Sequence, residues 1–426
     1  MIYALQVELS SKTIKSIRRN IAKQNSIFSE KKYLDSLYVP SNIVGRNEQA
    51  VQIIKHIESL RQGLVVPVIS VYGSSGTGKS AVVRFVCQNL QDITSFCFVN
   101  LRKSKTIFGS VNVILSNLGS TQLKSADGLN KAVEQIGNKI EEILASEQKK
   151  FFVLVLDEYD VIFYDKRGNP SDFMYKLLTL EETLREKGLW LCMITISNNT
   201  LADYNFDDRV KSRIGTSEVF FSQYNADDIY SILQERAQKA FLKKPDYKVI
   251  QYCSKICSAN SGDARRALDM LRVAGELSNG VSLTKDDIDK ANDQLQKDRI
   301  SALVTNASRH QKMVIAAICA NTITSENGWT STSSVYDRYK QLISSVSKPL
   351  SYRRVYDLLI EIENSGLVVS RTISRGRYGF GREYRLVIAP KLVGPLISKD
   401  WWDKIKSEFN SLYDFEYGGL YSKAKR

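Results

Sequence analysis

The segment Gly73-Ser74-Ser75-Gly76-Thr77-Gly78-Lys79-Ser80 constrains the fold most, because it fits the pattern G-x-x-x-x-G-K-[ST]. An apolar, strand-like run (VPVISVYG) leads into it, and a helix-like run (SAVVRFVCQNL) follows. In this context the backbone N–H groups of the loop and the helix N-terminus attract phosphates. Lys79 can reach the outer phosphates, and the Ser80 hydroxyl can ligate Mg²⁺. The segment therefore predicts a nucleotide site within an α/β domain.

Further apolar runs alternate with helical patterns along the first half of the chain: TSFCFVN, FFVLVLD and LWLCMITIS. Strands that alternate with helices imply crossover connections and a parallel sheet. The runs lack polar alternation, which is typical of a sheet covered on both faces. We predict an α/β fold with four parts: a basic segment (1–25), a nucleotide-binding α/β domain (26–224), a helical lid domain (225–298) and a winged-helix domain (299–426).

Composition and charge limit the class of protein. Among the 426 residues, 43% are hydrophobic and 25% are charged, as in ordinary globular proteins. No apolar run is long enough for a membrane span and no secretory signal is visible, so we expect a cytoplasmic protein without a membrane partner. The six cysteines stand among apolar neighbours, which favours buried thiols over metal ligands.

The net charge of +14 suggests a polyanionic partner, although an anionic membrane or solubility alone would also explain it. Residues 301–426 contain 19 Lys or Arg against 11 Asp or Glu. The basic excess is therefore concentrated in the last third of the chain. We expect this part to contact nucleic acid.

Acidic and amide side chains follow two of the apolar runs. FFVLVL ends at Asp157 and Glu158, where a strand of an open parallel sheet meets the ligand crevice. Asp157 would join the Mg²⁺ shell, and Glu158 would orient the attacking water. LWLCMITIS is followed by Asn198, which could hold that water or the γ-phosphate; a turn-forming Asn is the alternative.

Arginines occur at two further positions. Arg209 and Arg213 follow the last strand, and such arginines can reach into a neighbouring subunit's site as arginine fingers, unless they are ordinary surface residues. Gly262-Asp263-Ala264-Arg265-Arg266 begins a helix with two arginines in its first turn, where positive charge opposes the helix dipole. A γ-phosphate sensor would explain that placement.

A helix and a hairpin are predicted near the C-terminus. SYRRVYDLLIEIENSGLV predicts a helix that begins with Arg353 and Arg354, and its buried face holds Val355, Leu358, Leu359 and Ile362. It breaks at Ser365-Gly366 and enters a hairpin, so the outline is a winged helix. Residues 371–385 contain five arginines and one acid. A solvated turn is the alternative for the hairpin, but we expect DNA contacts at Arg353, Arg354, Arg375, Arg377, Tyr378 and Arg382.

These motifs, with Tyr38-Val39-Pro40 and Gly45-Arg46 ahead of the phosphate loop, resemble the archaeal origin-recognition and helicase-loader (Orc/Cdc-type) initiators, a branch of the AAA+ ATPases. The resemblance runs from about Ser26 to Pro390. It implies that Lys79 and Ser80 are Walker A residues, Asp157 and Glu158 Walker B, Asn198 sensor 1 and Arg265 sensor 2. It also implies an adenine site at Tyr38, Val39, Pro40, Val44 and Arg46, and DNA contacts at Arg102, Lys103 and Lys105 in a helical insertion.

The function implied by this resemblance is a slowly hydrolysing ATPase that initiates DNA replication. It would bind ATP or ADP with Mg²⁺, bind double-stranded origin DNA on the chromosome, and help to load the replicative helicase (MCM), alone or with other initiator subunits. The alternative is a nucleotide-switched DNA-binding regulator without helicase loading. A motor that remodels proteins is a third hypothesis, which the basic C-terminal region disfavours.

Overall fold

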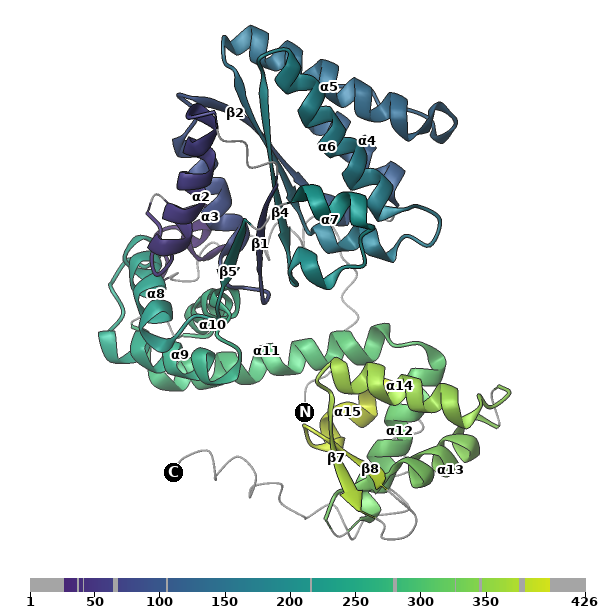
Figure 1. Cartoon of the computed structure of the whole chain (residues 1–426). Helices are drawn as coiled ribbons and strands as arrows, with labels where there is room; N and C mark the ends of the chain where they lie inside the picture. The colour runs from purple at the N-terminus through teal and green to yellow at the C-terminus, as the bar shows by residue number, and fades with distance from the viewer. Residues whose placement is uncertain are drawn as a thin grey trace, which may run out of the picture. The chain divides into compact units, whose positions relative to one another are not determined.

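The computed structural model divides into two compact units between Ala291 and Asn292. Each unit is described by itself below (Figure 1). The structure describes residues 27–36, 38–40, 42–63, 68–104, 106–214, 217–278, 282–325, 327–344, 347–374 and 380–398.

A five-stranded parallel sheet forms the centre of the first unit, with strand order β2-β3-β4-β1-β5. Its strands are β1 (Val68–Gly73), β2 (Thr94–Asn100), β3 (Phe151–Asp157), β4 (Trp190–Ser197) and β5 (Glu218–Phe221). The predicted parallel sheet and its first four strands are confirmed. Strand β5 was not predicted, because this edge strand has only four residues and half of them are exposed.

Helices cover both faces of this sheet (Figure 1). Residues of β3 alternate between two cores: Val153 and Val155 pack on one side, and Leu154 and Leu156 on the other. The first core receives α2 (Asn47–Arg61) and α3 (Lys79–Asn89). The second receives α4 (Ile107–Asn117), α5 (Gly128–Glu147), α6 (Pro170–Glu186) and α7 (Asp208–Ile214). This double cover explains why the strands read as unbroken apolar runs.

Three helices follow the sheet and form the lid: α8 (Ala226–Ala240), α9 (Tyr247–Asn260) and α10 (Ala264–Leu277). Asn225 caps α8 and Asp263 caps α10, each through its side-chain oxygen. The next helix, α11 (Lys285–Asn306), is continuous. The domain boundary that we expected after residue 298 therefore falls inside a helix.

The second unit has a winged-helix architecture. Its helices are α12 (Arg309–Thr324), α13 (Thr332–Ile343), α14 (Tyr352–Asn364) and α15 (Pro390–Ile397), and its antiparallel sheet has the order β6-β8-β7. The strands are β6 (Thr330–Ser331), β7 (Val368–Ser374) and β8 (Phe380–Leu386). The helix predicted at Arg353 is α14, and its four predicted apolar residues are buried. The predicted hairpin is β7 and β8.

Two further properties concern the described part of the chain. No helix there is long and apolar enough to cross a membrane. The six cysteines are free and buried, as the sequence pattern predicted. Burial raises the pKa of Cys87 to about 12, so this thiol stays protonated and unreactive.

Candidate functional site: a nucleotide cavity

A cavity of about 630 Å³ opens at the carboxyl ends of the strands in the first unit. The phosphate loop follows β1, Asp157 ends β3, and Asn198 follows β4, so the parallel sheet brings all three to one edge. The lid contributes α8 and α10 to the same cavity, and the segment before α2 contributes Tyr38 to Val44. The predicted residues that line it are Tyr38, Val39, Pro40, Val44, Ser75, Gly76, Thr77, Gly78, Lys79, Ser80, Arg102, Asp157, Glu158, Asn198 and Arg265.

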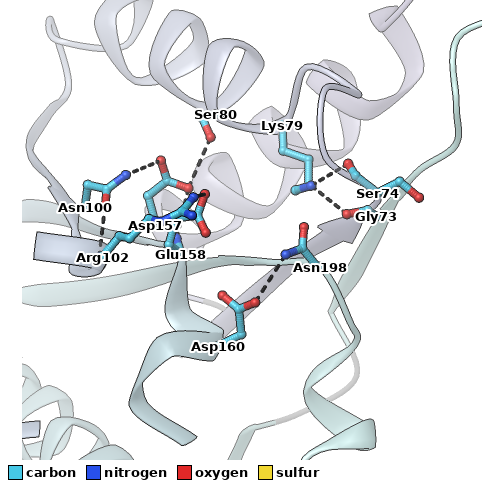
Figure 2. A network of polar contacts seen from close by, with 10 residues as sticks. All are labelled: Gly73, Ser74, Lys79, Ser80, Asn100, Arg102, Asp157, Glu158, Asp160 and Asn198. Atoms are coloured by element: carbon cyan, nitrogen blue, oxygen red, sulfur yellow. Dashed lines mark hydrogen bonds and ion pairs between the residues drawn. The ribbon is translucent and has the colours of Figure 1, made fainter. Parts of the chain in front are cut away.

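Lys79 begins α3 and is only 7% exposed. Its Nζ donates hydrogen bonds to the carbonyls of Gly73 (2.6 Å) and Ser74 (2.8 Å), which holds the loop closed around it (Figure 2). Burial lowers the pKa of Lys79, and the positive charge of Arg265 acts in the same direction. A buried ammonium held by neutral carbonyls is well suited to an anionic ligand.

Asp157 and Ser80 form the acidic end of the cavity. Ser80 Oγ donates to Asp157 Oδ1 at 3.1 Å, and Asn100 Nδ2 lies 3.5 Å from Asp157 Oδ2 (Figure 2). Burial raises the pKa of Asp157, and the Ser80 hydrogen bond opposes this shift. A buried carboxylate beside a hydroxyl offers the oxygen ligands that Mg²⁺ prefers. The residues present therefore fit this ion.

Glu158 leaves the strand in a left-handed conformation, with φ of 56°, which is uncommon for a residue other than glycine. Its backbone N–H donates to Asp157 Oδ1 at 3.0 Å, and its carboxylate lies 3.9 Å from the guanidinium of Arg102. Strained backbone conformations of this kind are concentrated at functional sites. The ion pair joins Arg102 to the residue that is expected to orient the attacking water.

Asn198 donates from Nδ2 to Asp160 Oδ2 at 3.2 Å (Figure 2). Neither Asp160 nor Asn100 was predicted to belong to the site. Asn100 could have been found, because it ends β2 in register with Asp157, and the ends of parallel strands meet at one edge. Asp160 lies in the 3-10 helix after β3, and no motif or residue spacing in the sequence points to it.

Arg265 lies in the first turn of α10, where the sequence placed it, and lines the cavity. Asp263 caps this helix by accepting the N–H of Arg265 at 2.8 Å. The N–H of Ala264 donates to the carbonyl of Gly76 at 3.2 Å, so the lid touches the phosphate loop directly.

Part of the cavity lining is apolar or aromatic. It includes Tyr38, Val39, Pro40 and Val44, together with Leu268 of α10. Arg236 of α8 donates to the Tyr38 carbonyl at 3.2 Å, and its guanidinium lies 4.6 Å from the Tyr38 ring centre. A flat base would find aromatic and aliphatic surface here.

Arg46, which the resemblance placed around the adenine, is directed elsewhere. Its Nε donates to the Thr77 carbonyl at 3.0 Å, and the residues that line the cavity do not include it. Gly73 and Ser74 also lie outside that lining and contribute through their carbonyls.

Arg209 and Arg213 lie on α7 and do not line the cavity of their own chain. Arg209 pairs with Asp207 at 2.7 Å, and Arg213 pairs with Glu182 at 3.3 Å. Both guanidiniums face the ring of Tyr175, at 5.2 and 4.9 Å from its centre.

The predicted DNA-contacting residues are divided among several segments. Arg353 and Arg354 are exposed at the start of α14, and Arg354 lies 3.7 Å from Asp357 and 3.6 Å from Glu361. Arg382 lies 3.4 Å from Glu363. Lys103 is exposed after β2. Lys105, Arg375, Arg377 and Tyr378 lie outside the described residues.

A stack of two arginines on one tryptophan at the winged-helix sheet was not predicted from the sequence. The guanidiniums of Arg371 and Arg385 lie 4.3 and 4.7 Å from the Trp329 ring centre. Arg371 also pairs with Glu383 at 2.7 Å.

Comparisons with known proteins match the three structural parts in order. Residues 69–218 match the ATPase family associated with various cellular activities (AAA), residues 230–293 match the Cdc6 AAA+ ATPase-type lid domain, and residues 302–394 match the Cdc6 C-terminal winged helix domain. The ORC1-type DNA replication protein 1 of Sulfurisphaera tokodaii is 30% identical over 417 residues, which cover 95% of this chain and 100% of the relative.

Solved structures give the same result. The structure of the Aeropyrum pernix ORC1 protein in complex with DNA has a TM-score of 0.72 and 28% identity, and the match covers 89% of this chain and 98% of that one. Cdc6p from Pyrobaculum aerophilum shares the fold, with a TM-score of 0.54 at 18% identity over 88% of this chain and 100% of that one.

The fold and the cavity define an AAA+ ATPase with a helical lid and a C-terminal winged helix. Within this class, the chain belongs to the Orc1/Cdc6 family, together with the archaeal ORC1-type DNA replication proteins.

Proposed function

We propose that this protein is an ATP-dependent initiator of DNA replication that binds double-stranded origin DNA and helps to recruit or load the replicative helicase. One observation carries the proposal. A cavity with the phosphate loop, Asp157, Glu158 and Arg265 occurs in the same chain as a winged helix, and 95% of the chain matches an ORC1-type protein.

The residues of the cavity suggest how ATP would be bound and hydrolysed. Lys79 would exchange its loop carbonyls for phosphate oxygens, and Arg265 would contact the γ-phosphate from the lid. Ser80 and Asp157 would hold Mg²⁺, which neutralises phosphate charge when it is bound. Glu158 would orient the attacking water once it is free of Arg102, and Asn198, fixed by Asp160, would hold that water from β4.

Turnover should be slow in an isolated molecule. Arg209 and Arg213 lie outside the cavity of their own chain, so an arginine finger could act only between molecules. An arginine finger contributes roughly 10³ to 10⁵ in rate where it operates. We therefore propose that assembly with other initiator subunits controls hydrolysis.

DNA would contact two parts of the chain. The A. pernix relative was solved in complex with DNA, and its match covers 89% of this chain. We propose that α14 enters the major groove with Arg353 and Arg354 at its start, while the hairpin that contains Arg375, Arg377, Tyr378 and Arg382 follows the backbone. Arg102, Lys103 and Lys105 would supply the second contact. A bipartite site of this kind favours bent or underwound DNA.

Three experiments test this proposal. Lys79→Ala should abolish ATP binding in calorimetry, while removal of residues 307–426 should strongly weaken DNA binding and leave ATP binding intact. Genome-wide mapping of bound sites separates initiation from regulation. A few sites at replication starts support the initiator, whereas sites spread over promoters would favour a nucleotide-switched regulator.

A further inference from the structure

Arg46 is buried to 4% exposure, yet its partners are not carboxylates. Nε donates to the carbonyl of Thr77 at 3.0 Å, Nη2 to that of Ser222 at 2.5 Å, and Nη1 to that of Gly45 at 3.3 Å. Among the described residues it forms no ion pair. Three carbonyls from separate segments therefore hold one full positive charge, an arrangement that requires the fork of donors that arginine alone provides.

The contact with Thr77 bears directly on phosphate binding. The Thr77 carbonyl and the Gly78 N–H belong to one peptide unit, which is planar and trans, so they point in opposite directions. Thr77 and Gly78 line the cavity, whereas Arg46 does not. By holding the carbonyl, Arg46 directs the Gly78 N–H away from itself. A flipped peptide would offer a carbonyl oxygen, which repels phosphate, in place of that donor.

The ring of Tyr224 packs against the guanidinium of Arg46. Its ring centre lies 3.8 Å from the guanidinium carbon of Arg46, and the residue is only 6% exposed. Its hydroxyl touches the loop: a Cβ atom on Gly78 would come within 2.3 Å of Tyr224 Oη. Gly78 also has a φ of 91°, so only glycine fits at this position. Tyr224 thus contacts both Arg46 and the phosphate loop.

The backbone of Tyr224 contacts the lid. Its N–H donates to the Gly262 carbonyl at 3.3 Å, and a Cβ atom on Gly262 would come within 2.8 Å of the Tyr224 carbonyl oxygen. Gly262 lies in the turn that precedes α10, the helix that carries Arg265. Tyr224 itself lies two residues before α8. One residue therefore touches the loop with its side chain and the start of α10 with its backbone.

We propose that Arg46 and Tyr224 are positioning residues that fix the Gly78 amide for phosphate binding and couple an occupied phosphate loop to the lid helix that carries Arg265. This inference rests on the proposed function, because it requires a nucleotide in the cavity. The coupling runs through a series of contacts. Phosphate would bind the Gly78 N–H, the Thr77 carbonyl accepts from Arg46, Arg46 packs on the Tyr224 ring, and the Tyr224 N–H donates to the Gly262 carbonyl. The direct hydrogen bond from Ala264 to Gly76 reinforces the same junction.

Four variants of the full chain separate the parts of this junction. Arg46→Met removes the donors and keeps the length, and Arg46→Lys keeps the charge without the fork or the flat face. Tyr224→Phe keeps the ring, and Tyr224→Leu removes it. Arg385→Met is the matched control, since it also removes a guanidinium from an aromatic ring but lies in the winged-helix unit.

Amide hydrogen exchange with saturating ADP is the decisive measurement. In the wild type, ADP should slow exchange both in the loop (73–80) and in the lid segment (261–268). In Arg46→Met and Tyr224→Leu, the loop should still be protected, while exchange in the lid segment should stay within about twofold of its rate without ADP. The control should behave as the wild type. Tyr224→Phe keeps the ring but loses the hydroxyl that touches Gly78, so it should retain more lid protection than Tyr224→Leu. Arg46→Met and Arg46→Lys should also weaken ADP about tenfold or more in calorimetry, because each loses hydrogen bonds from a charged donor.

The outcomes distinguish this inference from the proposed function. Lid protection equal to the wild type in both Arg46→Met and Tyr224→Leu would overturn the coupling. An equal loss in Tyr224→Phe and Tyr224→Leu would overturn the role of the stacked ring. Absence of ADP protection in the wild-type loop would instead refute nucleotide binding itself. If Arg46→Met does not fold, as judged by circular dichroism, the comparison of the two Tyr224 variants still decides the matter.

Discussion

The ion pair between Arg102 and Glu158 leads to a quantitative prediction for Arg102→Ala. The two side chains are 76% and 31% exposed, and their charged atoms are 3.9 Å apart. Exposed pairs of this kind contribute about 0.2 to 1 kcal/mol, which corresponds to a factor of about 1.4 to 5 in population. If Glu158 orients water only when it is unpaired, Arg102→Ala should raise kcat for ATP by at most about fivefold. KM should change little, because neither residue is needed to hold the phosphates.

The assay is steady-state phosphate release without DNA, at several salt concentrations. Salt screens an exposed pair, so the ratio of variant to wild-type kcat should approach one as ionic strength rises. Lys187→Ala is the matched control, because it breaks an exposed pair with Glu141 that lies outside the cavity lining. A fall in kcat for Arg102→Ala would refute the reasoning. So would a rise of much more than tenfold, which an exposed pair cannot supply.

Three further predictions follow from the described contacts. Arg353 is exposed and has no carboxylate partner among the described residues, whereas Glu363 partly neutralises Arg382. Arg353→Ala should therefore reduce the steepness with which the DNA-binding constant falls with salt, by about one in the slope of log Kobs against log salt concentration. Arg382→Ala should reduce that slope by less. Leu359 is fully buried in the winged-helix core, so Leu359→Ala should lower the free energy of unfolding, measured in urea, by about 2 to 5 kcal/mol. As the urea concentration rises, this variant should lose DNA binding at a lower concentration than ATP binding. Burial raises the pKa of Asp157 above its ordinary value of 3.8, so the ionised carboxylate destabilises the nucleotide-free fold. Asp157→Asn should therefore raise the unfolding midpoint at pH 7. This gain in stability should shrink as the pH falls through the raised pKa, and it should disappear below pH 3.8. A gain for Asp157→Asn that is independent of pH would show that ionisation is not its cause.

Local patterns made much of the fold predictable. The loop from Gly73 to Ser80 carries its own conformational demands, since Gly76 and Gly78 have φ of 77° and 91°. The buried strands are marked by unbroken apolar runs, and α14 by apolar residues at helical spacing. The elements that were missed, β5 and β6, have four and two residues, and their pairing partners are distant in the sequence. The continuity of α11 was missed because a helix with little apolar periodicity resembles a linker.

The site residues, too, could be predicted where the local sequence places them and could not where distant backbone contacts do. Lys79, Ser80, Asp157 and Asn198 each follow a strand or begin a helix, so the topology of a parallel sheet brings them to one edge. Arg46 could not be placed in this way. Its carbonyl partners Thr77 and Ser222 are 31 and 176 residues away, and a backbone carbonyl leaves no trace in the residue types of a sequence. A motif places an arginine near a nucleotide site, but only the folded chain shows whether its donors face the ligand or the loop that holds the ligand. At Arg46 they face the loop, so its substitution should alter phosphate binding and lid coupling rather than recognition of the base.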